Sequence, residues 1–490
     1  MKKCISSPLK LIAAGACLCG ILHTFPASAL PPGFQVYFND AQHSSPNGID
    51  TACAEFIGTA NETVAGAFYS IQRTVIVNAL IDAATRLGTE NVRIITDAGN
   101  RNSTGCQRLE AAGITVIDET CDGWQDAALE SHNKFCVIDG VKVWTGSYNI
   151  TDSDSVYNNN NALAIDCPQL AQEYLAEFNL MWGAASGPPG DCLFSSHKTP
   201  HSTHEFTCNG VDLELYFSPT KEAYPNRAMD VILNIMQQAT SSLYFDMFAF
   251  TSVSLANGLI TADDRGLTVM GVMDNQQASY SSSQYDNLIA AGLDVKLDNE
   301  VTPHGNFLHH KFLVADYAGT NPIVVTGSYN WSNAAQWNND ENSLIIHDAE
   351  IAYLYYEEFY RSYFGRNPDN AKPSIDIQVN QPVFSGGSFM RVTTRITNPD
   401  ISRGLDEYII LDLGSAFGDN QYFFWPDWTT AVDYERQYLG ADAVLDQEIF
   451  NFILPYPLAS GGPFTIWAAL LDPTTNTLAG DYDSIQFSFE

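Results

Sequence analysis

The chain has 490 residues, an apolar content of 45% and a formal net charge of −34 at pH 7. This length exceeds one hydrophobic core and predicts about three domains, while the apolar content excludes a disordered chain. The acidic surface disfavours a general nucleic-acid-binding face, because like charges repel at long range, but it leaves room for a local basic pocket. Adaptation to a salty exterior would produce the same surface.

Residues 1–29 have the pattern of a secretion signal. Lys2 and Lys3 give a basic start, the apolar run 11–22 follows, and a small-x-small cleavage site ends at Ala29. The apolar run is too short to span a bilayer comfortably. We therefore expect an exported protein, extracellular or periplasmic, that is cleaved near Ala29.

Three of the ten cysteines lie in this signal, and all the others lie in the first half of the chain. An oxidising location favours disulfides, and the locally sensible pairs are Cys106–Cys121 and Cys192–Cys208. Cys136 lies on an apolar strand and is predicted to be a buried free thiol. The odd number requires at least one unpaired cysteine or an intermolecular bond.

Residues 30–190 alternate between strand-like and helix-like segments. Apolar residues recur at helical spacing in 74–87, for example at Ile76 and Leu80, whereas 92–96 is a continuous apolar run. This alternation predicts an α/β unit with a largely parallel sheet. The expected strands are 35–38, 63–69, 92–96, 114–117, 141–145 and 162–165, and the expected helices are 49–60, 74–87, 106–113 and 169–182.

Residues 209–370 repeat this order of elements, and the sequence of 288–292 resembles that of 109–113. Such a repeat within one chain indicates an internal duplication. The expected strands are 213–217, 243–248, 267–274 and 344–346, and the expected helices are 229–238, 255–262 and 350–364.

A segment rich in Ser, Gly, Pro and His, 191–208, connects the two halves. Its cysteines and histidines allow a zinc site, but their spacing matches no common zinc finger. A surface loop closed by a disulfide is the favoured interpretation. The residues concerned are Cys192, His197, His201, His204 and Cys208.

The composition changes in 372–490, where strand-like runs are separated by Gly, Pro and Asn. This pattern predicts a β-sandwich domain of immunoglobulin-like type. The domain contains no histidine, so no catalysis is expected in it, and the choice between a binding or anchoring role and a spacer role stays open. The expected strands are 392–396, 408–413, 422–425, 449–454, 464–470 and 485–489.

One pattern of reactive residues occurs in both halves. It places a histidine and a lysine two positions apart, an aspartate further on, and then the sequence Gly-Ser-Tyr-Asn. Residues two apart in a strand share a face, so each histidine lies beside its lysine. The first copy contains His132, Lys134, Asp139, Ser147 and Asn149, and the second contains His309, Lys311, Asp316, Ser328 and Asn330.

Two such sets around one cavity would suit chemistry at a tetrahedral phosphorus. Lysine and asparagine side chains bind phosphate oxygens and stabilise developing charge, so no metal or other cofactor is expected. One histidine can attack phosphorus while the other protonates the departing oxygen. A single copy would more often be a surface feature and a turn. Two copies in one order, within a duplication, favour a catalytic site.

These motifs resemble the duplicated HKD signature of the phospholipase D superfamily, and the resemblance covers residues 31–370. It implies two α/β/α halves related by a pseudo-twofold axis, one active site at their interface, and a phosphohistidine intermediate that water or an alcohol resolves. Carried over, His132 is the nucleophile, and His309 is the general acid and then the base that activates water. The resemblance assigns phosphate binding to Lys134, Lys311, Ser147, Ser328, Asn149 and Asn330, and it counts Asp139 and Asp316 with the catalytic set, as supports of the reacting groups.

The two halves differ at one position that bears on the histidines. Members of the superfamily often have an acidic residue downstream of the motif, which orients an imidazole across the interface. Glu341 is such a residue, whereas Asn160 stands in its place in the first half. With crossing partners, His132 gains a carboxylate and His309 only an amide. A carboxylate stabilises an imidazolium and fixes its tautomer, which favours His132 as the nucleophile.

The superfamily includes phospholipases, nucleases and lipid synthases. The net charge argues against a nuclease, as do acidic residues just before the first motif, which are expected near the cavity mouth and would repel a polyanionic strand. They would tolerate a cationic head group, and Trp124 or Phe307 would contact that cation or the lipid chains. The acidic residues are Asp118, Glu119, Asp122 and Asp126.

We therefore expect a secreted phospholipase D that hydrolyses the distal phosphodiester bond of a phosphatidylcholine-like lipid to phosphatidic acid and the free head-group alcohol. An N-acyl or ceramide-type phospholipid is an alternative substrate. A metal-independent endonuclease of the same superfamily and a non-catalytic adhesin are the alternative functions. Because the duplication completes the site in one chain, we expect a monomer, in peripheral contact with a membrane.

Overall fold

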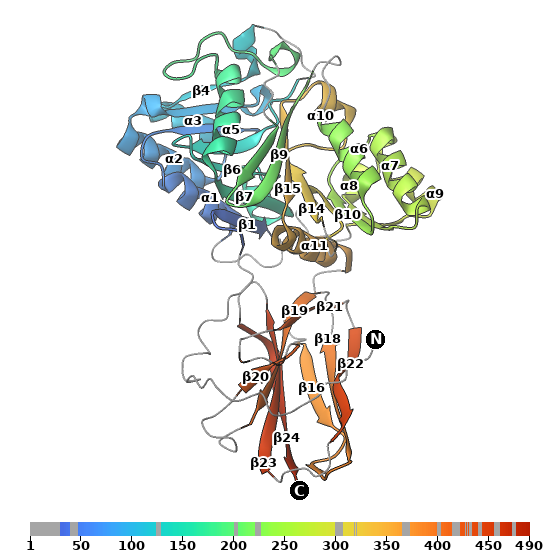
Figure 1. Ribbon diagram of the computed structural model, residues 1–490. Coiled ribbons are helices and arrows are strands. Elements are labelled where there is room, and N and C mark those ends of the chain that lie inside the picture. Colours follow the sequence, from blue (N-terminus) through green and yellow to red (C-terminus); the bar gives the residue numbers. More distant parts are fainter. Residues whose placement is uncertain are drawn as a thin grey trace. The chain divides into compact units, whose positions relative to one another are not determined.

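The computed structural model describes residues 30–39, 48–123, 129–199, 204–220, 227–298, 307–317, 319, 321–364, 373–398, 403–413, 422–426, 428, 430, 434–439, 443–454, 461–472 and 477–490. The chain divides into two compact units (Figure 1), of which one is Leu30–Gly365 and the other contains Arg366–Glu490. The expected secretion signal, residues 1–29, lies outside the described residues. In the described part of the chain, no helix has both the length and the apolar character that a membrane span requires.

The first half of Leu30–Gly365 is built on a seven-stranded sheet with the order β1-β7-β6-β5-β2-β3-β4. Only the β2–β3 and β3–β4 neighbours are parallel, and the other pairs are antiparallel. The expectation of a largely parallel sheet was therefore wrong. The motif strand β5 returns through a short turn directly onto β6, and a short turn joins only antiparallel strands. The strands are β1 (Phe34–Asn39), β2 (Val64–Phe68), β3 (Val92–Thr96), β4 (Thr115–Ile117), β5 (Lys134–Ile138), β6 (Lys142–Gly146) and β7 (Asn160–Asp166).

Helices cover both faces of this sheet, in the predicted α/β/α arrangement. On one face α1, α2 and α3 bury their apolar stripes against the strands, and on the other face lies α5. α5 begins at a proline, which suits the first turn because its nitrogen needs no partner, and it ends at Gly183 in the left-handed conformation (φ 78°). The helices are α1 (Ile49–Gly58), α2 (Thr74–Leu87), α3 (Thr104–Ala111), α4 (Asp152–Val156) and α5 (Pro168–Trp182).

The second half repeats this plan and so confirms the internal duplication. Its eight-stranded sheet has the order β12-β11-β10-β13-β14-β15-β9-β8, again with two parallel neighbour pairs, β10–β11 and β11–β12. Helices α6, α7 and α9 pack against one face and α11 against the other. The strands are β8 (Glu205–Cys208), β9 (Val211–Ser218), β10 (Ser242–Met247), β11 (Thr268–Met273), β12 (Asp294–Leu297), β13 (Lys311–Ala315), β14 (Ile323–Gly327) and β15 (Glu341–His347). The helices are α6 (Ala228–Gln238), α7 (Val253–Asp264), α8 (Asn275–Ala278), α9 (Tyr285–Ala291), α10 (Asn333–Trp337) and α11 (Ala349–Phe364).

The two halves share one apolar core, which contains α5, α11 and strand residues of both sheets. Hydrogen bonds cross the same interface in matched pairs. Thr145 Oγ1 donates to Asn342 Oδ1 over 2.9 Å, and the equivalent Thr326 Oγ1 donates to Asn161 Oδ1 over 2.8 Å. A tyrosine hydroxyl of α5 or α11 also reaches each of these asparagines. This matched pattern agrees with pseudo-twofold symmetry, and it holds the motif strands β5 and β13 in a fixed relation.

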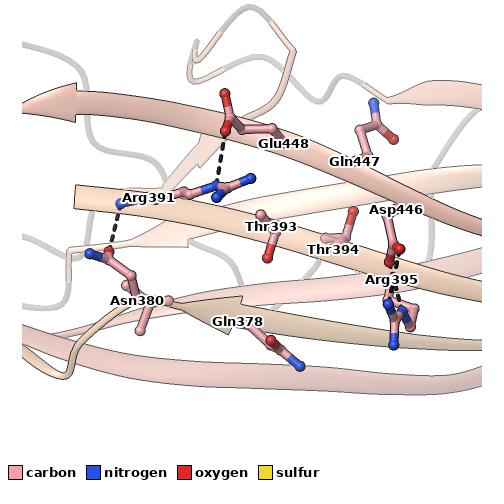
Figure 2. Close-up of a pocket in the computed structure, with 10 residues that line it drawn as sticks. Gln378, Asn380, Arg391, Thr393, Thr394, Arg395, Asp446, Gln447 and Glu448 are labelled. Atoms are coloured by element: carbon pink, nitrogen blue, oxygen red, sulfur yellow. Dashed lines mark hydrogen bonds and ion pairs between the residues drawn. The ribbon is translucent and has the colours of Figure 1, made fainter. Parts of the chain in front are cut away.

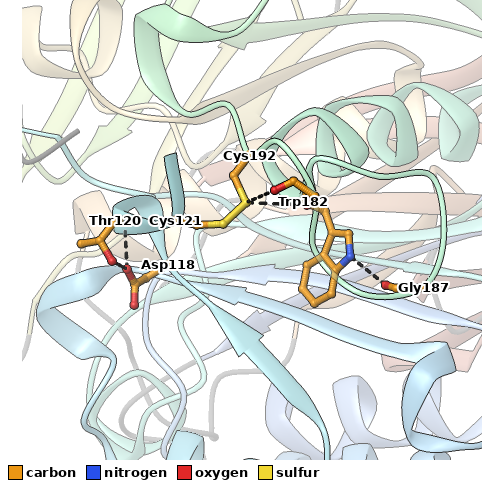
Figure 3. The surroundings of a disulfide bond; sticks show 7 residues. Asp118, Thr120, Cys121, Trp182, Gly187 and Cys192 are labelled. Carbon is orange, nitrogen blue, oxygen red and sulfur yellow. Dashed lines mark hydrogen bonds between the residues drawn. A yellow bond between two sulfur atoms is a disulfide. The ribbon is translucent and has the colours of Figure 1, made fainter. Parts of the chain in front are cut away.

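The disulfides differ from the predicted pairs. Cys121 is bonded to Cys192 (Figure 3), and Cys167 is bonded to Cys208, with Cα–Cα distances of 5.9 and 5.7 Å. The pairs Cys106–Cys121 and Cys192–Cys208 were therefore wrong. The prediction joined cysteines that are near in sequence, but the segment after α5 turns back along that helix and brings distant cysteines together. The free cysteines of the described residues, all buried, are Cys53, Cys106 and Cys136, of which the last was predicted.

The linker histidines bind protein groups. His197 Nδ1 lies 3.0 Å from Asp122 Oδ2, and His204 Nδ1 lies 2.9 Å from the carbonyl oxygen of Leu215. His201 lies outside the described residues. The described residues contain no group of three or more His, Cys, Asp or Glu side chains arranged to hold a metal ion. The linker is thus tied to the fold by two disulfides and by β8, and it is not a loop closed on itself.

The unit that contains Arg366–Glu490 is an all-β sandwich, as predicted. A three-stranded sheet, β16-β18-β22, and a six-stranded sheet, β17-β24-β23-β19-β20 with β21 beside β19, enclose one apolar core. The strands are β16 (Ser374–Val379), β17 (Val383–Phe384), β18 (Phe389–Asn398), β19 (Arg403–Asp412), β20 (Tyr422–Phe424), β21 (Glu435–Leu439), β22 (Ala443–Ile453), β23 (Gly461–Asp472) and β24 (Thr477–Phe489).

The exposed face of β16, β18 and β22 has a polar depression with a volume of about 510 Å³ (Figure 2). Arg391 Nε lies 2.9 Å from Glu448 Oε2, and Arg395 Nε lies 2.6 Å from Asp446 Oδ1. Because each of these arginines is paired with a carboxylate, the depression offers polar side chains but little net charge. None of the residues that line this depression belongs to either motif.

Candidate active site

The two histidines of the motifs are oriented by residues of the opposite half. His132 Nδ1 lies 2.7 Å from Glu341 Oε2, and His309 Nδ1 lies 2.8 Å from Asn160 Oδ1. All four side chains are buried. The crossing of the partners that the superfamily resemblance implied is therefore confirmed. With Nδ1 bonded to an acceptor, each ring keeps Nε2 for exchange with a substrate.

Each lysine of the motifs lies against the histidine two positions before it. Lys134 Nζ donates to the carbonyl oxygen of His132 over 2.7 Å, and Lys311 Nζ donates to that of His309 over 2.8 Å. The site residues of both halves also interact electrostatically, since Lys134 and Lys311 both act on each imidazole. The two sets of motif residues thus form one cluster rather than two sites.

An aromatic ring supports each histidine and lysine pair. The Tyr69 ring lies edge-on to His132 with centroids 4.8 Å apart, and Lys134 Nζ lies 5.0 Å from its centroid. Phe248 has the same relation to His309, at 4.8 Å, and to Lys311, at 4.9 Å. Sequence reasoning missed both rings. Each one directly follows an equivalent strand, β2 or β10, and that matched position was the signal that could have found them.

Burial and mutual repulsion control the protonation of the cluster. Burial lowers the pKa of Lys134 to about 8, and burial together with the charge of Lys134 lowers the pKa of Lys311 well below its usual range. Burial and the two lysines also lower the pKa of His132 and of His309. The cluster is therefore a site where a bound anion would be strongly favourable, because it would offset the repulsion between the cationic groups.

Ser147 and Ser328 hold the orienting residues, and their contact with a phosphate stays a prediction. Ser147 Oγ donates to Asn160 Oδ1 over 3.1 Å and accepts a hydrogen bond from the backbone nitrogen of Asn161 over 3.0 Å. Ser328 Oγ accepts a hydrogen bond from the backbone nitrogen of Asn342 over 3.0 Å. Each serine thus attaches the start of the orienting strand, β7 or β15, to the end of its neighbour, β6 or β14.

Asn149 and Asn330, the other predicted phosphate-binding residues, lie beside these elements. Asn149 is buried, and within the described part of the chain its Oδ1 has no hydrogen-bond partner. Asn330 is only partly buried, and its Oδ1 accepts a hydrogen bond from the backbone nitrogen of Ala249 over 3.4 Å. Contact of their amides with a phosphate stays a prediction.

Asp139 and Asp316 lie at the far ends of β5 and β13 from the motif lysines, about 16 Å along an extended strand. Each carboxylate accepts hydrogen bonds from three successive backbone N–H groups, at distances of 2.7 to 2.9 Å. These aspartates fix the turn before β2 or β10, so their geometry supports a structural role and not contact with the reacting groups. The N–H groups belong to Asn61, Glu62 and Thr63 for Asp139, and to Thr240, Ser241 and Ser242 for Asp316.

The acidic residues before the first motif are used within the protein. Glu119 is buried and accepts a hydrogen bond from the backbone nitrogen of Ala98, and burial raises its pKa to about 8. Asp118 pairs with Arg101 at 3.4 Å, and Asp122 pairs with His197. Asp126 and Trp124 lie outside the described residues. The described acids therefore give little support to the predicted acidic cavity mouth.

Phe307, the other predicted contact for a head group or lipid chain, lies near the site. Its ring centroid is 5.5 Å from that of Phe248, which in turn packs on His309. Its carbonyl oxygen accepts a hydrogen bond from the backbone nitrogen of Asn159 in the first half. Phe307 thus extends the apolar wall beside the second histidine.

Two further carboxylates, Asp97 and Asp274, fix the approach to the motifs, and sequence reasoning did not assign them a role. Asp274 Oδ2 accepts a hydrogen bond from the backbone nitrogen of Leu308 over 3.1 Å, and Asp97 accepts one from that of Ser131. Leu308 and Ser131 directly precede the two histidines. Both aspartates close equivalent strands, β3 and β11, which was the available signal.

The chain matches a family model described as a PLD-like domain of cardiolipin synthase over residues 53–182 and 232–363. The two matched segments correspond to the two halves of the duplicated unit. Together they make up more than half of the chain.

The similar curated proteins include a mitochondrial cardiolipin hydrolase of Mus musculus, which is 32% identical over 29% of this chain and 61% of that protein. A phospholipase D of Rickettsia conorii is 29% identical over 28% of this chain and 64% of that protein. The chain thus spans less than two thirds of the length of these relatives. Among solved structures, a phosphatidylserine synthase of Haemophilus influenzae is 14% identical, with a TM-score of 0.49, over 66% of this chain and 84% of that chain.

Proposed function

The chain belongs to the family of phospholipase D-like domains, and on that premise we propose that it is an exported phosphodiesterase that hydrolyses phospholipids. The bond that breaks joins phosphorus to the head-group oxygen, and the products are phosphatidic acid and the head-group alcohol. One observation carries the proposal. Two imidazoles from different halves have their Nδ1 atoms held across the interface, and each has a buried lysine beside it.

In the first step, His132 attacks phosphorus. In the neutral ring, Nδ1 carries the proton and donates a hydrogen bond to Glu341. The lone pair is therefore on Nε2, which forms the new P–N bond. The P–O bond to the head group breaks, and protonated His309 gives its Nε2 proton to the departing oxygen. Lys134 and Lys311 stabilise the charge on the non-bridging oxygens as it develops.

In the second step, water displaces His132 from phosphorus. Neutral His309 takes a proton from the water through Nε2, the water oxygen bonds to phosphorus, and the P–N bond breaks. Phosphatidic acid leaves, and His309 is again protonated. Burial lowers the pKa of His309 in the free protein, but a bound phosphodiester anion opposes that effect. The substrate thus favours the acid form of His309 that the first step needs.

Three observations support a phospholipid over a nucleic acid. The net charge of −34 disfavours the approach of a polyanionic strand. Phe248 and Phe307 give the second half-site an apolar wall. The curated relatives are named as a cardiolipin hydrolase and a phospholipase D, and both names refer to phospholipid substrates.

Head-group release from vesicles tests the proposal. Vesicles of phosphatidylcholine, phosphatidylethanolamine, cardiolipin or sphingomyelin are incubated with the protein, and the free alcohol is measured. We expect release from at least one lipid, and a loss of about 10³-fold or more in His132→Ala and in His309→Ala. His347→Ala is the matched control, because His347 pairs with Glu214 at the other end of β15. Its activity should equal that of the unmodified protein.

Plasmid DNA and RNA are tested in parallel. Cleavage of either one without head-group release would replace the lipid proposal with a nuclease. A His132→Ala, His309→Ala double variant that matches the unmodified protein on every phosphodiester would support the alternative of a non-catalytic adhesin.

Mapping of the covalent intermediate tests the roles of the two histidines. A P–N bond to histidine breaks in acid, so the trapped intermediate is quenched in base and mapped by mass spectrometry. A phosphatidyl group on His132 is expected, and one on His309 would reverse the two roles.

A further inference from the structure

The two histidines have unequal partners, and the position of a second carboxylate explains the difference. His132 faces the carboxylate of Glu341, whereas His309 faces the amide of Asn160. A neutral amide stabilises an imidazolium less than a carboxylate does. The half that lacks the carboxylate on its orienting strand has one on the helix before it, at Asp154 in α4.

The equivalent helices α4 and α10 define this exchange. In α4 the cap residue Thr151 accepts a hydrogen bond from the backbone nitrogen of Asp154, and in α10 the cap residue Ser332 accepts one from that of Ala335. Asp154 and Ala335 are therefore equivalent positions. The first half combines Asp154 with Asn160, and the second combines Ala335 with Glu341. Each half has one carboxylate and one neutral residue at these two positions, in opposite order.

Asp154 is buried, with 3% of its surface exposed, and its carboxylate faces the site. Its Oδ1 lies 3.4 Å from His309 Nδ1. The charge of His309 and several hydrogen bonds keep the pKa of Asp154 below its usual value, although burial opposes this. The hydrogen-bond donors to this carboxylate are Thr151 Oγ1, Asn149, Asn158 Nδ2 and Asn160 Nδ2.

Asp154 also determines which end of the Asn160 amide faces His309. Asn160 Nδ2 donates to Asp154 Oδ1 over 2.9 Å, so Asn160 Oδ1 faces His309 Nδ1. Ser147 Oγ donates to the same Oδ1, which reinforces the orientation. An amide held in this way accepts the Nδ1 proton and leaves Nε2 to exchange protons with the substrate.

We propose that Asp154 is a positioning residue for His309, which acts across 3.4 Å and through Asn160 to supply the negative charge that Glu341 supplies directly to His132. The proposal rests on the proposed function for the role of His309 as the general acid. It gives that acid a carboxylate set back behind an amide, while the nucleophile has a carboxylate in direct contact.

The other charged groups around His309 make this carboxylate necessary. Lys311 on β13, and Lys134 and His132 at the start of β5, all disfavour a proton on His309. The carboxylate of Asp154 favours a proton on His309 and so counteracts these groups. Asp274, after β11, favours the protonated form of Lys311. Removal of the charge at Asp154 should therefore weaken the acid form of His309 more than it affects His132.

A tautomer measurement tests the positioning without any substrate. The full chain is labelled with [¹⁵N]histidine, and the His309 signals are assigned by their loss in His309→Ala. In the unmodified protein at neutral pH we expect the Nδ1–H tautomer. In Asp154→Ala we expect a mixture with Nε2–H, because Asn160 Nδ2 loses its bond to Asp154 Oδ1 and keeps only the 3.3 Å bond to the Asp154 carbonyl oxygen, so the amide is less firmly oriented. This result is independent of whether phospholipids are the substrate.

Two phosphocholine esters, p-nitrophenyl phosphocholine and phosphatidylcholine, test the role in proton transfer. The p-nitrophenolate of the first leaves without protonation, whereas the head-group oxygen of the second needs an acid. We expect kcat for phosphatidylcholine to fall about 10- to 100-fold in Asp154→Ala, with KM little changed, while the burst of p-nitrophenol stays within about threefold. If Asp154→Ala folds poorly, the isosteric Asp154→Asn takes its place and should give the same kinetic result. Asp152→Asn is the control, because Asp152 lies on the same helix but is 71% exposed and pairs with Arg73.

The double variant Asp154→Ala, Asn160→Glu reproduces the arrangement of Ala335 and Glu341. It should restore the Nδ1–H tautomer and raise kcat for phosphatidylcholine at least about tenfold above that of Asp154→Ala. A folded Asp154→Ala protein with an unchanged tautomer and unchanged rates would overturn the proposal. Equal losses on both esters that the double variant does not reverse would also overturn it. An unmodified protein that ignores phosphatidylcholine would defeat the proposed substrate, and the tautomer measurement would still decide the role of Asp154.

Discussion

The Nδ1 atom of His132 lies 2.7 Å from Glu341 Oε2, although the two residues are 209 positions apart in the chain. This contact crosses the interface between the duplicated halves, as does that between His309 and Asn160. Neither half orients its own histidine. Folding of each half alone therefore leaves both imidazoles without their partners, and the site exists only where the shared core holds the two sheets together.

Replacing Glu341 with glutamine should lower kcat about 10²- to 10³-fold with little change in KM. The amide loses the charge that stabilises the imidazolium character of His132, and it can present nitrogen instead of oxygen to Nδ1. Glu214→Gln is the matched control, because Glu214 Oε1 lies 3.0 Å from His347 Nε2 at the far end of β15. Steady-state kinetics on the preferred lipid decides the point, and a Glu341→Gln activity within twofold of the unmodified protein would contradict it.

The value of kcat/KM should pass through a maximum near pH 8 and fall above it. Burial lowers the pKa of Lys134 to about 8, so the ammonium form that binds phosphate is present below that pH and is lost above it. Burial raises the pKa of Glu341 to about 8 as well, so the carboxylate form that accepts the His132 Nδ1 hydrogen bond becomes more populated as the pH rises toward 8, which raises activity. The fall should thus persist in Glu341→Gln. A soluble diester assayed from about pH 6 to 10 tests this, and a profile flat to the alkaline end would exclude it.

Asp316→Asn should destabilise the fold by about 2–3 kcal/mol and leave the kcat of folded protein within about threefold. The carboxylate accepts three backbone N–H bonds, which hold the pKa of Asp316 below its usual value although burial opposes the shift. A lowered folded pKa gives stability that is present above the unfolded pKa and is lost as the pH falls through the folded one. The cost of Asp316→Asn should therefore shrink in acid.

Denaturant unfolding at neutral and at acidic pH measures this cost. Asp264→Asn is the control, because Asp264 is an exposed aspartate at the end of α7. If Asp316→Asn lost as much kcat as His309→Ala at unchanged stability, Asp316 would have a catalytic role and not a structural one.

Segments with a clear period were predicted closely from sequence. The helix expected at 74–87 is α2 (Thr74–Leu87), and the strand expected at 92–96 is β3 (Val92–Thr96). The helix follows from the spacing of its apolar residues and the strand from a continuous apolar run, and both patterns report directly which residues are buried. Period does not report which strands are neighbours, so the parallel sheet was wrong. Helices as short as α8 and α10 contain too few turns to show a period.

The site was predicted where the duplication supplied a second copy to compare. Comparison of the copies placed Asn160 opposite Glu341, the superfamily resemblance implied that the partners cross, and the structure confirms the contact of His132 with Glu341. Asp154 was missed because its equivalent, Ala335, is not polar, so the comparison gave no matched pair. Its partner His309 also comes from the other half. Contacts between distant segments depend on packing that one sequence does not display.

The disulfide bonds of the protein should join the cysteines that are paired in the structure and not those that are neighbours in the sequence. A non-reducing peptide map should contain Cys121–Cys192 and Cys167–Cys208, and peptides with Cys106–Cys121 or Cys192–Cys208 would contradict the structure. The sequence separations of 71 and 41 residues predict a stability loss of about 4 kcal/mol for each paired Cys→Ala replacement, because each cross-link restricts the unfolded chain. The kcat of folded protein should be unchanged, since these cysteines do not contact the motif histidines. Cys136→Ala, which removes a buried free thiol, is the control: its effect on stability should not depend on added reductant, whereas the unmodified protein should lose stability in reductant.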